Sequence, residues 1–147
     1  MAYDLPTFSP GYRLIDGTDL NSQSDALGIS TVILPIPALS GLADSQTRKV
    51  AVPFPFEVTA VSFRVGDPAT TASKLATLTA QVSGTAVTGG VVNLTSANCT
   101  PSGAAVAGSA ITGANTGAAG GTLEVAVSAV TAFVEGDGYV EFTVVHL

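Results

Sequence analysis

Between Lys74 and Glu124 the chain contains no Asp, Glu, Lys or Arg. This stretch consists almost entirely of Gly, Ala, Ser, Thr, Val and Leu, so it lacks the ionising and coordinating groups on which most catalytic sites depend. Disordered segments are usually poor in branched apolar residues and rich in charge, and this stretch is neither. The composition therefore favours short β-strands joined by turns of small residues.

The low charge of the whole chain points the same way. Of its 147 residues, 11% are charged, against about 25% in a typical soluble domain. A monomer with so few charges would expose apolar patches, and such patches usually mark contact surfaces. We therefore expect an obligate assembly, in the simplest case a homo-oligomer.

Charge and hydropathy also argue against several classes of partner. A net charge of −6 disfavours nucleic acid, whose phosphates attract clustered Lys and Arg. No apolar run reaches the ~18 residues that a membrane-spanning helix needs, so we expect no membrane partner. The first residues lack the basic and apolar regions of a signal peptide, which predicts synthesis in a cytoplasm.

Residues 1–28 differ in composition from the remainder of the chain. They hold several charged residues, and Pro and Gly interrupt any regular period, which predicts an irregular N-terminal arm rather than a helix or strand. Apolar side chains along the arm would dock it on its own domain or on a neighbouring subunit. The residues that we expect to make this attachment are Tyr3, Phe8, Tyr12, Arg13, Leu14, Ile15, Asp16, Asp19 and Asn21.

Residues 29–147 form the second predicted unit, a single all-β domain. Short runs of β-formers recur along it between Gly and Pro turns, and we count about eight candidate strands. This spacing indicates an antiparallel β-sandwich, for which a jelly roll is one natural arrangement of eight strands.

Local patterns place some of these strands. The apolar run 31–34 is followed by Pro35, which predicts an edge strand or the end of one. Strict alternation over 56–65 would put Val58 and Phe63 on opposite faces of their strand.

Alternation near the end of the chain directs Val140, Phe142 and Val144 toward a core. Around Gly89 and Gly90 the pattern suggests two separate short strands.

Two acidic groups resemble functional sites only in part. The stretch 16–25 is rich in oxygen ligands, yet it lacks the spacing and the closing Glu of a calcium loop, so a series of Asx turns explains it better. Glu135, Asp137 and Glu141 form a small acidic cluster that could supply the two carboxylates that a glycosidase uses. The chain has no Trp to form a sugar platform, so we interpret this group as a solvated hairpin turn.

Cys99 and His146 are the single cysteine and the single histidine. No motif brings a nucleophile and a base together, so Cys99 is expected to act as a plain small apolar residue. His146 is expected to be exposed, with a subunit interface as its alternative role. We therefore predict no enzyme, no cofactor and no metal site.

Two segments carry a resemblance to a known family. Residues 11–21 and 137–145, in a chain poor in charge and in helix, resemble segments of small structural proteins of tailed bacteriophages. These proteins are the capsid decoration (cement) proteins and the head-fibre bases. The resemblance implies a virion protein, made in the cytoplasm of a bacterial host, that binds the major capsid protein on the outer capsid surface. It also implies a homotrimer that stabilises the shell.

A different class of function remains open from the residues alone. A β-sandwich of this size also suits a binding module for carbohydrate or for a host surface, as in adhesins. Such a module would present exposed aromatic side chains to its ligand.

Overall fold

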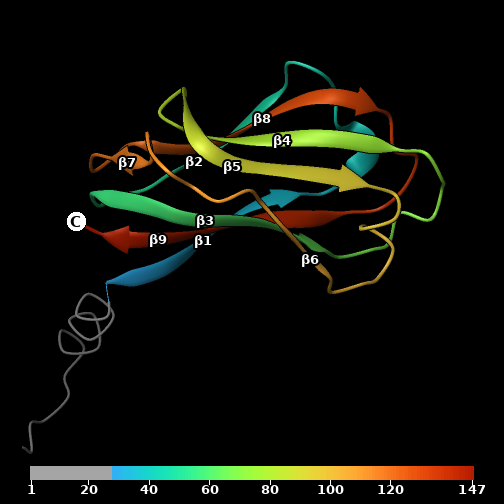
Figure 1. Cartoon of the computed structure of the whole chain (residues 1–147), viewed down its shortest axis with the longest axis horizontal. Coiled ribbons are helices and arrows are strands. Elements are labelled where there is room, and N and C mark those ends of the chain that lie inside the picture. The colour runs from blue at the N-terminus through green and yellow to red at the C-terminus, as the bar shows by residue number, and fades with distance from the viewer. Residues whose placement is uncertain (1–27) are drawn as a thin grey trace, which may run out of the picture.

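Two antiparallel sheets packed against each other make up the protein (Figure 1). The structure is a computed structural model that describes residues 28–147. The first sheet contains β1 (Ile29–Ile36), β3 (Phe56–Val65), β6 (Ala105–Ala107), β7 (Thr116–Gly117) and β9 (Gly138–His146). The second sheet contains β2 (Thr47–Ala51), β4 (Leu75–Val82), β5 (Thr85–Thr95) and β8 (Thr122–Thr131). One 3-10 turn, η1 (Leu39–Gly41), lies between β1 and β2.

The order of the strands is that of a jelly roll. The first sheet runs β1-β9-β3-β6, with the two-residue β7 also paired to β3, and the second runs β2-β8-β4-β5. With β7 set aside, every connection crosses from one sheet to the other except the β4–β5 hairpin. The predicted antiparallel β-sandwich is confirmed, and β1 is an edge strand as the run before Pro35 predicted.

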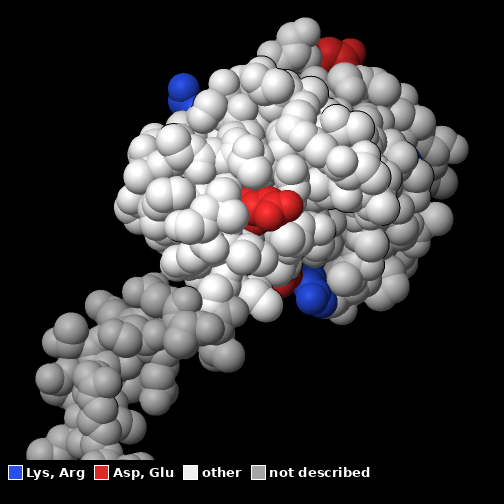
Figure 2. Space-filling model, turned by 60° about the vertical axis from the view of Figure 1, so that its left-hand side comes forward, with Lys and Arg blue, Asp and Glu red and all other residues white. Residues whose placement is uncertain are grey.

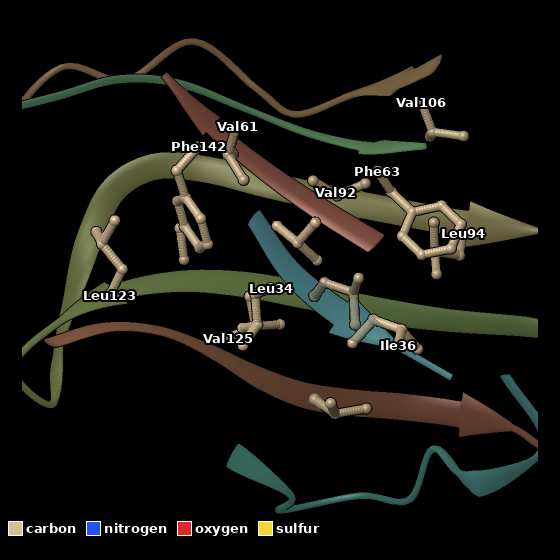
Figure 3. Packing of buried hydrophobic residues seen from close by; sticks show 14 of the residues in the cluster. Leu34, Ile36, Val61, Phe63, Val92, Leu94, Val106, Leu123, Val125 and Phe142 are labelled. Atoms are coloured by element: carbon tan, nitrogen blue, oxygen red, sulfur yellow. The ribbon is translucent and has the colours of Figure 1, made fainter. Parts of the chain in front are cut away.

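One hydrophobic core fills the space between the sheets. Figure 3 shows side chains from β1, β3 and β9 meeting those from β5 and β8. Val140, Phe142 and Val144 are fully buried, which confirms the core face predicted for the last strand. Burying a side chain of this size contributes about 1.5 to 3 kcal/mol, so β9 anchors the centre of its sheet.

The alternation predicted for β3 is wrong. Val58 and Phe63 both lie in the core, although strict alternation puts them on opposite faces. The register between β3 and β9 shifts between Val58 and Ala60, so Thr59 is an extra, exposed residue in a β-bulge. The bulge moves every later side chain of β3 to the other face.

A single segment closes one side of the sandwich. We call residues 104–117 the strap (the orange stretch between the labels β6 and β7 in Figure 1). At its two ends the strap bonds to β3, through the carbonyls of Ala104 and Asn115. In its middle it bonds to β5, where Gly90 N–H donates to the carbonyl of Ser109 and Ser109 N–H donates to the carbonyl of Val91. One backbone segment thereby joins both sheets.

Glycine allows the strap to lie this close to β5. Gly89 has a φ of +88°, and a Cβ at this position would lie 1.9 Å from the carbonyl oxygen of Ala110 in the strap. Gly89 and Gly90 therefore do not separate two strands as predicted, because β5 continues through both of them.

Replacing Gly89 by Ala should loosen the strap. Gly84→Ala is the matched control, since Gly84 also has a positive φ of +82° but open space around its Cβ position. We expect Gly84→Ala to lower the free energy of unfolding by about 1 to 2 kcal/mol through backbone strain alone. Gly89→Ala should lower it by about 3 to 4 kcal/mol, because the strap must also move away. Urea unfolding of both variants measures the difference, and equal losses would contradict the role given to the strap.

Candidate interaction surface

The nine predicted attachment residues, Tyr3 to Asn21, lie outside the described residues. The stretch 16–25, interpreted as Asx turns, also lies outside them. The structure therefore bears on the other candidate groups, which all fall within 28–147.

Cys99 and His146 lie at opposite ends of the sandwich. His146 pairs with Phe56 at the start of β3, whereas the carbonyl of Cys99 accepts the N–H of Ala69 in the loop after β3. A ten-residue strand spans about 30 Å, so the two side chains are too far apart to act together. Cys99 is fully buried, and burial raises the pKa of its thiol.

His146 is part of the packing at its end of the sandwich. Its ring stacks on Phe54 with 3.8 Å between centroids, and a 2.8 Å hydrogen bond joins its Nε2 to Ser30 Oγ. The expectation of an exposed histidine is wrong, because the ring is half-buried between Phe54 and the start of β1.

Glu135 holds the loop that follows β3. Its Oε1 accepts hydrogen bonds from the backbone N–H and the hydroxyl of both Thr70 and Thr71, at 2.6 to 3.0 Å. These four donors favour the charged form, and they lower the pKa of Glu135 to about 2. A carboxylate held in this way is a structural acceptor and a poor proton donor near neutral pH.

The two neighbouring carboxylates also have structural partners. Asp137 Oδ1 accepts the N–H of Asp67 at 2.8 Å, and Glu141 forms an ion pair of 2.8 Å with Arg64. The interpretation of this region as a hairpin turn is wrong, because β8 and β9 belong to different sheets and the segment between them crosses from one to the other. Its acceptors tie that crossing to the β3–β4 loop.

Other features of the described part offer little for chemistry. Residues 28–147 contain no group of three or more His, Cys, Asp or Glu able to hold a metal ion. The same part of the chain has no helix with the length and apolarity needed to span a bilayer. A surface hollow of about 340 Å³ lies beside the β4–β5 hairpin. Its lining residues are Val82, Ser83, Thr85, Ala114, Thr116, Gly117 and Ala118, which are neither ionisable nor aromatic.

The charge-free stretch of the sequence forms a continuous part of the surface. It includes all of β4 and β5, the strap and the turn before β8. The exposed side chains of the strap are short and uncharged, namely Ala105, Ala107, Ser109, Ala110, Thr112, Ala114 and Thr116. Figure 2 shows how few charged groups interrupt the uncharged surface on one face of the molecule. The strap is therefore the candidate interaction surface in the described residues.

The sequence contained a signal for this surface. The absence of charge from Lys74 to Glu124 indicated it, but periodicity did not show that the stretch closes the sandwich. Strap contacts depend on pairing between segments distant in the chain, such as Gly108 N–H with the carbonyl of Val61.

Comparison of the chain with family models, with curated proteins and with solved structures finds no match.

Removing the Glu135 carboxylate should change the acid sensitivity of the fold. Its folded-state pKa lies below the ordinary value of 4.5, so it stabilises the protein fully above pH 4.5 and loses this effect as the pH falls toward about 2. Glu135→Gln should therefore have a lower free energy of unfolding than the wild type at pH 6. Between pH 4.5 and 2 it should lose less of this free energy than the wild type does. Thermal unfolding across this pH range measures both.

Asp67→Asn is the control for this experiment. Its carboxylate accepts no hydrogen bond from residues 28–147, so the substitution removes a charge from the same loop without removing an acceptor. A pH profile for Glu135→Gln that matched the wild type would show that the four hydrogen bonds do not stabilise the loop.

Proposed function

We propose that this chain is a non-catalytic structural protein of a bacteriophage virion, which decorates the outer surface of the capsid and reinforces it. The observation that carries the proposal is the strap, an uncharged surface whose backbone is bonded to both sheets. A cement protein must bridge neighbouring shell subunits, so it needs fixed complementary surfaces and no reactive groups.

The side chains of the strap suit burial against a protein shell. Ala loses no side-chain entropy when it is buried, and Ser and Thr lose little compared with Lys, Glu or Arg. Without charges, the surface also avoids the desolvation penalty that buried ions carry. Many copies on one capsid lattice would then multiply a weak individual contact through avidity.

The proposed partners are the major capsid protein and further copies of this chain. The resemblance to decoration proteins supports a homotrimer on the capsid surface. In this proposal the residues from Tyr3 to Asn21 anchor the sandwich to the capsid or to a neighbouring subunit. A fully extended chain of 27 residues reaches about 90 Å, enough to cross an adjacent subunit.

The binding-module alternative has less support. Tyr139, with 37% of its surface exposed, is the one large exposed aromatic among residues 28–147. The hollow beside the β4–β5 hairpin has no aromatic or charged lining. A glycan array with the purified protein tests this alternative, and specific binding of one glycan class would favour it over capsid decoration.

A charge placed on the strap should prevent attachment to the capsid. Ala107→Glu adds a carboxylate at the last residue of β6, where the side chain is exposed, so the fold should tolerate it. We expect the variant to bind empty heads of the cognate capsid protein at least ~10-fold more weakly, since an unpaired charge would be buried. Co-sedimentation with heads measures the change.

Ala43→Glu is the matched control, because Ala43 is exposed in the connection between η1 and β2, away from the strap. It should bind heads as the wild type does. Equal binding by Ala107→Glu and the wild type would rule out the strap as the attachment surface.

Deleting residues 1–21 should separate folding from attachment. The core is built from residues 34–144, so the shortened chain should keep the circular dichroism and the cooperative unfolding of the full chain. It should no longer co-sediment with heads. Retained binding by a folded, shortened chain would remove the N-terminal residues from the anchor.

A further inference from the structure

The sheet edges are covered on one long side of the sandwich and open on the other. On one side the strap covers the edges of β3 and β5. On the other side β1 and β2 end their sheets, and no strand of residues 28–147 pairs with their outer edges. Open edges present unpaired N–H and C=O groups, which recruit another strand unless the sequence prevents it.

The edge of β2 carries features that prevent pairing. Lys49 is exposed on this short strand, and Arg48 lies in register with the fully buried Val125. Arg48 therefore lies on the inward face of its strand, and its buried Nε has no hydrogen-bond partner among residues 28–147. Lysine and inward-pointing charges are devices by which natural edge strands avoid addition of another strand.

The edge of β1 has no such charge. Two of its side chains on the outer face, Ile29 and Ile33, are 61% and 51% exposed. Its only protective residue is Pro35, close to its end. An uncharged edge with exposed β-branched side chains favours pairing with another strand.

Hydrogen bonding to β9 fixes which groups of β1 are available. His146 N–H donates to the carbonyl of Gly28 at 2.7 Å, so Gly28 and His146 form a hydrogen-bonded pair. In an antiparallel ladder such pairs alternate, so the even-numbered residues of β1 bond to β9 and the odd-numbered ones direct N–H and C=O outward. Pro35 fits this phase, because its missing N–H falls on the open edge.

The outward residues are self-complementary. We propose that β1 pairs with β1 of a second copy of this chain, antiparallel and about a two-fold axis at Thr31. Ile29 then lies opposite Ile33 of the partner subunit, and Thr31 lies opposite Thr31 of the partner subunit. Each facing pair exchanges two backbone hydrogen bonds, and the β-branched and Thr–Thr pairs on the outer face add to the stability. The first sheet continues unbroken from one copy to the next.

This contact does not depend on binding to a capsid. A two-fold contact at β1 is also different from the three-fold contact of a trimer, so both can exist in one assembly. In that case β1 joins one trimer to its neighbour. The mass in solution is then an even multiple of the 14.6 kDa chain mass, either a dimer or a pair of trimers.

Charge substitutions at the two-fold axis test the proposal in the full chain. Thr31→Lys and Thr31→Glu each place two like charges opposite one another, so each variant alone should lose the contact and show half the wild-type mass by light scattering. An equimolar mixture of the two variants should recover the wild-type mass, because opposite charges then meet at the axis. Thr59→Lys, on β3 in the same sheet, is the control and should keep the full mass.

Two results would overturn the proposal. One is a wild-type protein that is monomeric or purely trimeric at every concentration up to the millimolar range. The other is a mixture of the Thr31 variants that stays at half mass.

Amide hydrogen exchange identifies the paired edge directly. The Ile33 amide faces outward and should be protected in the wild type and exchange rapidly in Thr31→Lys. The Val32 amide bonds to β9 and should stay protected in both. Protection of Ile33 in the half-mass variant would show that part of the same chain covers the edge, which would contradict pairing with a second copy.

Discussion

The backbone hydrogen bonds of the strap are the contacts on which the closed side of the sandwich depends. A chain with so few charges cannot protect four sheet edges with lysines, so two of them must be covered by its own backbone. The strap covers both at once because it bonds to β3 at its ends and to β5 in its middle. Its close approach requires small residues, which explains why glycine and alanine are so frequent from Lys74 to Glu124.

The few carboxylates of the described part act mainly as internal acceptors. They join segments far apart in the chain, often across the connections between the sheets, and most accept a backbone or amide N–H. The pairs are Asp44 with Val130, Glu57 with Asn115, Glu135 with Thr70 and Thr71, and Asp137 with Asp67. Acidic residues that could suggest a catalytic group in the sequence thus hold loops in the fold.

Much of the fold, but less of the site, could be predicted from the sequence. Alternation in 140–144 identified a core face correctly, because β9 is regular and flanked by strands on both sides. The same rule failed in β3, since a bulge at Thr59 depends on the pairing with β9 and leaves no mark in the local pattern. Strand order and the path of the strap likewise depend on long-range pairing. The absence of charge from Lys74 to Glu124 indicated a contact surface. The difference between covered and open sheet edges could be recognised only from the strand order.

The position of β9 also affects when this fold can form. β9 lies between β1 and β3, so the two earlier strands of the first sheet have no partner in common until β9 is present. β8 has the same role between β2 and β4 in the second sheet. During translation, the second sheet is complete only after β8 has left the ribosome, and the first only after β9 has, so β1 and β2 stay without their neighbouring strands until then. Folding that depends on such long-range pairing is slow, so a low aggregation tendency of the unpaired strands becomes a requirement on the sequence.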